Sequence, residues 1–193
     1  MRVITGEYRG RKLETPENYD VRPTSDKVKE AVFNLLMNDT YDAVFCDLFA
    51  GTGSLGIEAL SRGARLCYFG DNSRDSIRMI HHNLTHVGAE KKAVVIPGDY
   101  KKVLNRLNEK IDVFLIDPPY RAGLYENCLE QIDTLDLLAP DGIILTEHDS
   151  RTPMPENVGG FVLERVRKYG KTSVSIYRRK AEENVEGGAG AEE

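Results

Sequence analysis

Short apolar runs alternate with amphipathic stretches along the chain from residue 43 to residue 147. In the amphipathic stretches, apolar residues recur every three or four positions, which is typical of helices that bury one side. The apolar runs are AVFCDLF, RLCYFG, KAVVIPG, DVFLID and GIILTE. The helical stretches are SLGIEALSRG, SRDSIRMIHHNLTHV, YKKVLNRLNE and LYENCLEQIDTLDLL. Strands that alternate with helices predict an α/β fold with a mainly parallel, doubly wound sheet.

The two ends of the chain carry different patterns. Near the start, VITGEYRGRKLETP alternates and contains glycines, which predicts a small β-hairpin. The following RPTSDKVKEAVFNLLMN predicts an amphipathic helix, which Thr24, Ser25 or Asp26 can cap. Near the end, FVLERVRKYGKTSVSIYRR has two alternating runs around the tripeptide YGK at residues 169–171. This pattern predicts an antiparallel hairpin.

These patterns divide the chain into three parts. We expect a hairpin and helix at residues 1–40, the main α/β domain at residues 41–180 and a disordered acidic tail at residues 181–193. The tail holds five glutamates and no Lys or Arg, so it accounts for the net charge of −5 and the rest is neutral. Positive charge gathers at Arg2, Arg9, Arg11 and Lys12, and at Arg165, Arg167, Lys168, Lys171, Arg178, Arg179 and Lys180. From charge alone, a phosphate-backbone partner and an ordinary solvated surface explain these clusters equally well.

The composition is typical of a single-domain cytoplasmic protein. A chain of 193 residues can bury one full-sized core, and its apolar stretches are too short for a membrane span or a signal peptide. Cys46, Cys67 and Cys128 are odd in number and widely spaced among apolar neighbours. We expect reduced, buried thiols rather than a disulfide framework or a metal site.

Acidic residues recur at the ends of the predicted strands. Asp47, Asp71, Asp99 and Asp117 each end or follow a different apolar run. In doubly wound sheets, ligands bind beyond the carboxyl ends of the strands. We therefore expect these four acids to meet on one rim of the sheet and to form a ligand site.

The first strand leads into DLFAGTGSLG at residues 47–56, which matches the G-x-G-x-x-G pattern of nucleotide-binding turns. Asp71 follows about twenty residues later, where it can accept hydrogen bonds from ribose hydroxyls. Alone this pattern suits NAD, FAD or S-adenosylmethionine, or a glycine turn without a ligand. Acids at Asp47 and Asp99 favour S-adenosylmethionine, which has an ammonium, a ribose diol and an adenine amine. The predicted cofactor contacts are Asp47, Phe49, Ala50, Gly51, Thr52, Gly53, Asp71, Asn72, Asp99 and Tyr100.

The fourth apolar run ends in LIDPPY at residues 115–120. Proline cannot donate to a sheet ladder and restricts the residue before it, so the strand stops there. The turn holds the Asp117 carboxylate and the Pro118 carbonyl in a stiff backbone. Such groups can accept the two hydrogens of an exocyclic amine and aim its lone pair at a methyl donor. Tyr120 can stack on the base.

The order DLFAGTG, Asp71, GD and DPPY resembles class I methyltransferases that modify exocyclic amines of nucleobases. GEYRGRKL, RPTSDKVKEAVFNLL, DLFAGTGSLGIEALSRGA and DPPY, in this order, resemble the RsmD family over residues 1–180. Its members are bacterial methyltransferases for a guanine N2 of small-subunit ribosomal RNA. One departure is FGDNS, where such proteins often carry Glu, so Asp71 is one methylene shorter.

This resemblance implies a seven-stranded Rossmann-like methyltransferase sheet with a C-terminal antiparallel hairpin and a small N-terminal β-hairpin extension. It implies S-adenosylmethionine as cofactor, ribosomal RNA or the small ribosomal subunit as partner, no metal, no membrane, and a monomer. The catalytic residues would be Asp117, Pro118 and Tyr120. The substrate contacts would be Arg9, Arg11, Arg22, Thr24, Pro119 and Lys171.

Three other functions remain open at this point. An N6-adenine methyltransferase on DNA or RNA uses the same amine chemistry, but the chain has no room for a separate target-recognition domain. A nicotinamide oxidoreductase leaves DPPY unexplained, and a non-catalytic RNA-binding factor has no need of the intact Asp117 turn. His82 and His86 have a spacing that zinc can use, but no third ligand is evident. His148 is a further candidate for the cleft lining.

Overall fold

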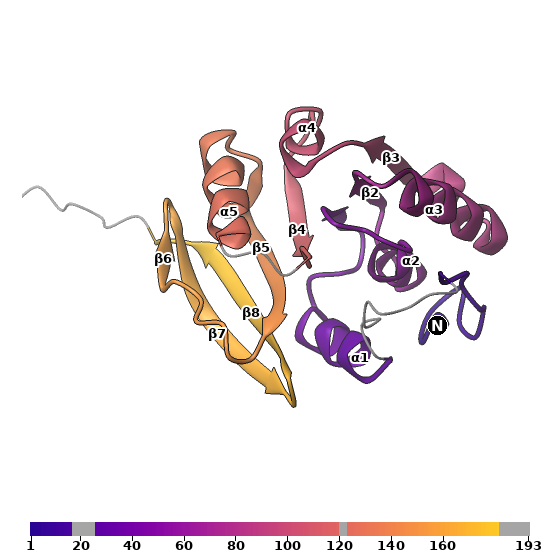
Figure 1. The fold of residues 1–193 in the computed structure, drawn as a ribbon, viewed down its shortest axis with the longest axis horizontal. Helices are drawn as coiled ribbons and strands as arrows, with labels where there is room; N and C mark the ends of the chain where they lie inside the picture. The colour runs from indigo at the N-terminus through magenta and orange to yellow at the C-terminus, as the bar shows by residue number, and fades with distance from the viewer. Residues whose placement is uncertain (17–25, 120–122, 182–193) are drawn as a thin grey trace, which may run out of the picture.

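The computed structural model describes residues 1–16, 26–119 and 123–181 (Figure 1). Within these residues, eight strands form one sheet in the order β3-β2-β1-β4-β5-β8-β7-β6. The first five are parallel, and β8, β7 and β6 are antiparallel. The strands are β1 (Val44–Asp47), β2 (Leu66–Asp71), β3 (Ala93–Pro97), β4 (Ile111–Ile116), β5 (Leu138–Asp149), β6 (Asn157–Val158), β7 (Phe161–Tyr169) and β8 (Thr172–Arg179).

This arrangement confirms the predicted doubly wound α/β sheet with its C-terminal antiparallel hairpin. The predicted seven strands are present, and β6 is an eighth strand of two residues that pairs with the start of β7. Two residues are too few to produce an alternating pattern, which is why the sequence does not signal this strand.

The described helices follow the predicted order. They are α1 (Asp26–Leu35), α2 (Ser54–Ser61), α3 (Arg74–Val87), the 3₁₀-helix η1 (Glu90–Lys92), α4 (Tyr100–Leu104) and α5 (Leu124–Thr134). Two boundaries differ from the sequence pattern. The α4 helix has only five residues, and β5 begins at Leu138, inside a stretch that was expected to be helical. Asp136 has a φ of 49°, and this left-handed turn separates α5 from β5.

Helices cover both faces of the sheet. The α1, α2 and α3 helices pack on one face, here called the α2 face, and α4 and α5 pack on the other (Figure 1). Side chains alternate between the faces along β4: Val113 and Leu115 join the α2 face, whereas Phe114 and Ile116 join the opposite one. This alternation decides which strand-end side chains can meet.

The N-terminal segment, residues 1–16, lies against α2. A single antiparallel bridge joins Arg2 and Lys12, so only one residue pair is bridged where the sequence predicted a hairpin. The Glu58 carboxylate of α2 accepts hydrogen bonds from the backbone of Ile4 at 2.8 Å and Thr5 at 3.0 Å. The segment is therefore part of the main body and packs its apolar side chains into the α2 face.

The three cysteines are free, buried thiols, as the sequence predicts. Burial raises the pKa of all three. Among the described helices, none combines the length and apolar character needed to cross a membrane.

Candidate functional site

The loop between β1 and α2 has the backbone shape that its glycines allow. Gly51 and Gly53 have φ values of 55° and 78°, in the left-handed region that favours glycine. A Cβ atom on Gly51 would have no atom within 4 Å, so this part of the loop is open to a ligand. A Cβ on Gly56 would lie 2.3 Å from the ring of Phe69. The third glycine therefore allows α2 to pack closely on β2.

Asp71, at the end of β2, is tied to this glycine loop. Its Oδ2 accepts a hydrogen bond from the backbone N–H of Gly51 at 2.9 Å, and its Oδ1 accepts one from Ser73 at 2.8 Å. The side chain is half-buried, and a carboxylate has lone pairs for further donors. Asp71 can thus position the loop and still accept from a ligand. The adjacent Asn72 is exposed.

Asp47, at the end of β1, is only 2% exposed. Its Oδ2 accepts a hydrogen bond from the backbone N–H of Gly56 at 3.1 Å. Burial raises the pKa of this carboxyl to about 7, and the charge of Asp71 contributes in the same direction. Asp47 therefore supports the first turn of α2, and an approaching cation would favour its ionised form.

The third strand-end acid, Asp99, caps the short α4 helix. Its side chain accepts a hydrogen bond from the backbone N–H of Lys102 at 2.9 Å and is exposed. The next residue, Tyr100, lies beside Phe49 of the glycine loop, with ring centroids 6.3 Å apart. Both rings are half-buried, so they offer a partly exposed aromatic surface between β1 and β3.

Asp117 directly follows β4. Leu115 belongs to the α2 face, so the alternation of side chains along β4 places the Asp117 side chain on that face. Phe45 also belongs to the α2 face, so the same alternation along β1 places Asp47 there. Burial, Glu147 and Asp47 together raise the pKa of Asp117 well above its ordinary value. Pro118 is buried and Pro119 is exposed. Tyr120, Arg22 and Thr24, which the sequence also predicted for the site, lie outside the described residues.

Glu147 is a further carboxylate at this rim, and the sequence interpretation did not include it among the candidate residues. It lies near the end of β5, and the register of Ile116 with Thr146 places it beside Asp117. The signal was present in the alternation of Ile143, Leu145 and Glu147, because the first two belong to the α2 face. The three carboxylates of Asp47, Asp117 and Glu147 thus lie near the carboxyl ends of adjacent strands, on one face of the sheet.

His148 has a structural role instead of lining the cleft. Its side chain is buried, with Nε2 at 2.8 Å from the hydroxyl of Ser175 and Nδ1 at 3.0 Å from the carbonyl of Asp149. Burial lowers the pKa of the imidazole. Tyr125 of α5 donates its hydroxyl to the Glu147 carbonyl at 2.8 Å. These contacts hold the end of β5 in place.

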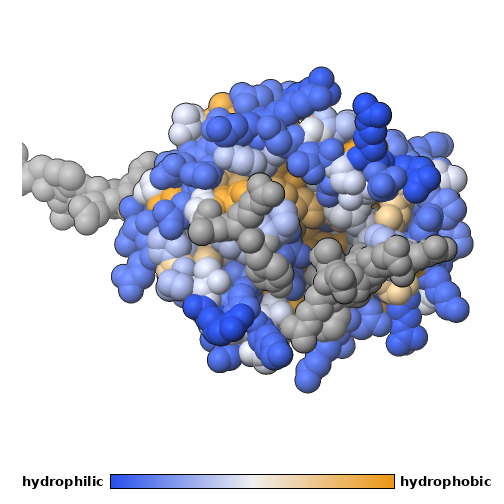
Figure 2. All heavy atoms as spheres, viewed as in Figure 1, coloured by the Kyte–Doolittle hydropathy of each residue, from blue (hydrophilic) through white to orange (hydrophobic). Residues whose placement is uncertain are grey.

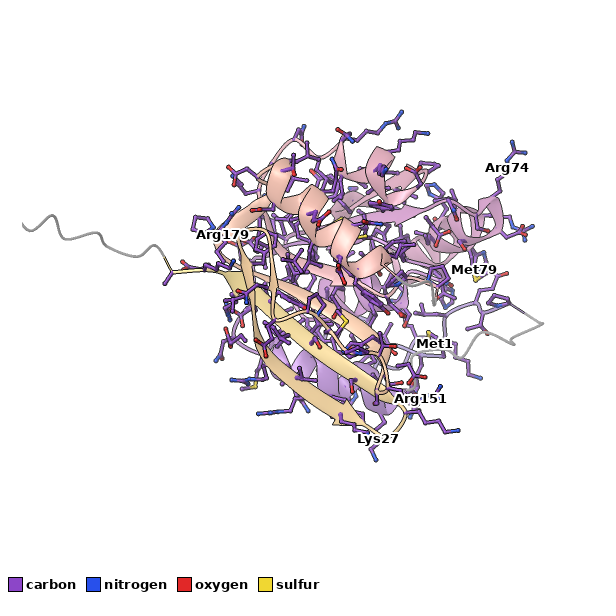
Figure 3. The ribbon with its side chains drawn as sticks, turned by 60° about the vertical axis from the view of Figure 1, so that its left-hand side comes forward. Met1, Lys27, Arg74, Met79, Arg151 and Arg179 are labelled. Carbon is purple, nitrogen blue, oxygen red and sulfur yellow. The ribbon has the colours of Figure 1, made fainter. Side chains whose placement is uncertain are left out.

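Among the described residues, the basic side chains predicted to contact RNA lie in two separate places. The β8 strand pairs with β5 in antiparallel register, Asp149 opposite Thr172, so Lys171 lies at the carboxyl rim and is exposed. Figure 3 shows Arg151 and Arg179 at opposite ends of these C-terminal strands. Residues 164–168 of β7 are exposed and include three basic side chains. Figure 2 shows a largely hydrophilic face, with apolar residues visible mainly near its centre.

Arg9 and Arg11 are not brought beside Asp117. The Arg11 guanidinium donates to the carbonyl of His86, near the end of α3, at 3.0 Å. The turn before it contacts Ser61, the last residue of α2. Because α2 begins at the glycine loop and runs away from it, this basic turn lies at the far end of the helix.

In the part of the chain that the structure describes, no group of three or more His, Cys, Asp or Glu side chains is arranged to hold a metal ion. The His82 imidazole lies 3.4 Å from the carboxylate of Glu14 and is 61% exposed. It stacks on His86 with ring centroids 6.5 Å apart. These histidines form an exposed helix face.

Comparisons with known proteins agree with this architecture. The model of the family described as "Conserved hypothetical protein 95" matches residues 1–178. The chain is 39% identical over 183 residues to "Putative rRNA methyltransferase YlbH" of Bacillus subtilis, covering 93% of this chain and 100% of the relative. It is 32% identical to "Ribosomal RNA small subunit methyltransferase D" of Escherichia coli, covering 94% and 91%.

Solved structures give the same result. "Putative methyltransferase yhhF from Escherichia coli" superposes with a TM-score of 0.83 at 30% identity, covering 94% of this chain and 98% of that one. A putative methylase from Haemophilus influenzae gives a TM-score of 0.77 at 30% identity, covering 92% and 97%. The chain therefore belongs to the family described as Conserved hypothetical protein 95, and its resemblance to the RsmD family is confirmed.

Proposed function

We propose that this protein transfers a methyl group from S-adenosylmethionine to the exocyclic N2 amine of a guanine in small-subunit ribosomal RNA. The observation that carries the proposal is the placement of the acidic side chains at the carboxyl ends of adjacent strands. Asp117 lies on the same face of the sheet as Asp47, one strand away from the glycine loop, and the two prolines follow it directly. The relatives named as ribosomal RNA methyltransferases support the RNA as substrate.

The residues present fit the cofactor. Gly51 leaves open space where its Cβ would be, so a ligand can approach the loop backbone. Asp47, Asp71 and Asp99 offer carboxylates on three adjacent strand ends, which suit an ammonium, a ribose diol and an adenine amine. Phe49 and Tyr100 offer aromatic surface beside them. When bound, S-adenosylmethionine supplies a sulfonium methyl group that needs no further activation.

The task of Asp117 and Pro118 is to prepare the amine. The lone pair of a guanine N2 amine is delocalised into the ring, so the amine is a weak nucleophile. Each of its hydrogens can be accepted by one group, the Asp117 carboxylate or the Pro118 carbonyl, which favours a pyramidal nitrogen. The carboxylate then stabilises the positive charge that develops on nitrogen and accepts the released proton.

The RNA must present a base that has left its stack, at a cost of a few kcal/mol. Contacts with the phosphate backbone can offset that cost. In this proposal, Lys171 and the exposed basic residues of β7 bind phosphates near the rim, since the β7–β8 turn lies at the carboxyl end of β5. Stacking of the base on Tyr120 remains a prediction from the sequence.

The proposal is tested by incubating the protein with S-adenosylmethionine labelled on its methyl group and three acceptors: bacterial small subunits, free small-subunit RNA and DNA. The RNA or DNA is then digested to nucleosides and separated. Labelled N2-methylguanosine from RNA is the expected product. Labelled N6-methyladenine, or no transfer to any acceptor, would contradict the proposal. Calorimetry showing tighter binding of NAD than of S-adenosylhomocysteine would instead favour the oxidoreductase.

A further inference from the structure

Glu147 and Asp117 form a pair of carboxylates at the proposed acceptor position. The parallel register aligns Ile116 with Thr146, so Asp117 and Glu147 occupy the next position on neighbouring strands. Adjacent strands lie about 4.8 Å apart. Glu147 also lies opposite Val174 of β8, whose side chain belongs to the α2 face. Both carboxylates therefore emerge on the same face of the sheet.

The backbone around Glu147 is held from both sides. The Tyr125 hydroxyl donates to its carbonyl, and the neighbouring His148 ring is fixed by Ser175 and by the carbonyl of Asp149. A strand end held in this way can place a side chain reproducibly, which is what recognition of a single base edge requires. The strand register that places Glu147 beside Asp117 agrees with the contribution of Glu147 to the raised pKa of Asp117.

Two acceptors suit one nucleobase edge. Guanine carries its N1–H and its N2 amine side by side, so this edge presents adjacent donors. Adenine carries its N6 amine beside N1, which is an acceptor and would face a carboxylate unfavourably. An ionised carboxylate has acceptors only, and an unpaired acceptor pressed against it costs binding energy.

We propose that Glu147 is a specificity-determining residue: its carboxylate accepts the N1–H of the target guanine, while Asp117 and Pro118 accept the hydrogens of the N2 amine. This inference rests on the proposed function and adds the reason for choosing guanine over adenine. It assigns the two carboxylates different tasks, one for recognition of the base and one for the reacting amine.

The probe is an RNA in which 2-aminopurine replaces the guanine that the wild-type protein methylates, as located by nucleoside mapping. This base keeps the 2-amine, but its N1 carries a lone pair in place of a hydrogen. The wild-type protein should methylate the guanine RNA at least about a hundredfold faster than the 2-aminopurine RNA. Because 2-aminopurine also lacks O6, the informative quantity is the change of this ratio between variants.

In Glu147→Gln the side-chain amide can donate to an unprotonated N1, and the fold contacts of the Glu147 carbonyl are kept. The guanine to 2-aminopurine rate ratio should fall by about tenfold or more, since the amide accommodates either base. The matched control is Glu164→Gln, because Glu164 is an exposed carboxylate of β7 paired with Arg178 at 2.7 Å. Its ratio should equal that of the wild type.

A ratio for Glu147→Gln equal to the wild-type ratio would overturn the inference, even if both rates fall. If the variant reacts too slowly, the relative binding of the two RNAs gives the same comparison. It is measured by letting them compete for the protein while 2-aminopurine fluorescence is monitored. If Glu147→Gln prefers the guanine RNA over the 2-aminopurine RNA as strongly as the Glu164→Gln control does, this result would also overturn the inference. Failure of the wild-type protein to form N2-methylguanosine is a different outcome, which contradicts the proposed function itself.

Discussion

The side-chain amide of Asn83 joins the N-terminal segment to the glycine loop. Its Nδ2 donates to the carbonyl of Thr52 at 2.9 Å and to that of Glu14 at 3.1 Å, and its Oδ1 accepts from the Glu14 backbone at 2.7 Å. Asn83 is completely buried in α3. One side chain from a third element therefore holds residues 1–16 beside the proposed cofactor loop.

Asn83→Ala should lower the free energy of unfolding by about 1–3 kcal/mol, because it leaves the Thr52 carbonyl and the Glu14 backbone without this partner. It should also weaken the binding of S-adenosylhomocysteine, because the loop loses its support. Urea denaturation and calorimetry measure the two effects. His81→Ala, at an exposed position of the same helix, should change neither. Unaltered ligand affinity in Asn83→Ala would show that the loop keeps its shape without Asn83.

A second buried contact fixes α1 to α2. The Lys29 ammonium lies 3.5 Å from the Glu58 carboxylate, and both side chains are completely buried. The ammonium also donates to the carbonyl of Arg2 at 2.6 Å and to the hydroxyl of Ser54 at 3.0 Å. Burial lowers the pKa of Lys29, and Glu58 opposes this shift.

Lys29→Met should lower the free energy of unfolding by about 1–3 kcal/mol, because it removes the buried donor of the Arg2 carbonyl and the Ser54 hydroxyl, while Arg62 remains 2.8 Å from the Glu58 carboxylate. Denaturation in urea measures the change. Lys27→Met is the matched control, because Lys27 is exposed on the same helix, and it should be nearly neutral. A Lys29→Met variant as stable as the wild type would contradict a stabilising role of the Lys29 ammonium.

Asp47 should make stability depend on pH. Its folded-state pKa is raised to about 7, so its protonated form favours folding at low pH, and that contribution is lost as pH rises through 7. Asp47→Asn removes this titration. We therefore expect the variant to gain stability relative to the wild type between pH 5 and pH 8, by an amount on the order of 2–4 kcal/mol.

Urea denaturation of both proteins across this pH range measures the difference. Most other titrating groups are common to both proteins and largely cancel; Asp117 is the exception, because Asp47 contributes to its raised pKa. Asp136→Asn is the control: Lys110 lowers the pKa of Asp136, which puts its titration below this range. Its stability difference from the wild type should stay flat from pH 5 to pH 8. Parallel curves for Asp47→Asn and the wild type would be evidence that Asp47 does not titrate near 7.

Asp117→Ala should reduce the rate of methyl transfer by about a hundredfold or more, by analogy with the loss of one preorganised polar contact at a reacting centre. Binding of S-adenosylhomocysteine should remain close to that of the wild type, because Asp117 is assigned to the acceptor. Single-turnover transfer and calorimetry separate the two effects. Asp133→Ala, on α5 away from the rim, is a control for rate. Normal methylation by Asp117→Ala would refute the proposed mechanism.

Much of the fold follows from local pattern. The strands and helices between residues 43 and 147 appear in the predicted order, because apolar periodicity is a local property of the chain. Boundaries were less predictable. The start of β5 depends on pairing of Leu138 with Ile111, and β6 exists only because β7 lies beside it. Such pairings join residues that are distant in sequence, so no short window contains them.

The sequence by itself determined the sheet type, the glycine loop and the acids at the strand ends. Periodicity, glycine spacing and the DPPY turn are all properties of short stretches of the chain. Only the tertiary structure decided how those acids are used. It directs Asp47 to the first turn of α2, ties Asp71 to Gly51 and brings Glu147 beside Asp117. It also places the Arg11 guanidinium against the carbonyl of His86, near the end of α3. Register between strands and packing between helices decide these neighbours, and both are set by contacts across the whole domain.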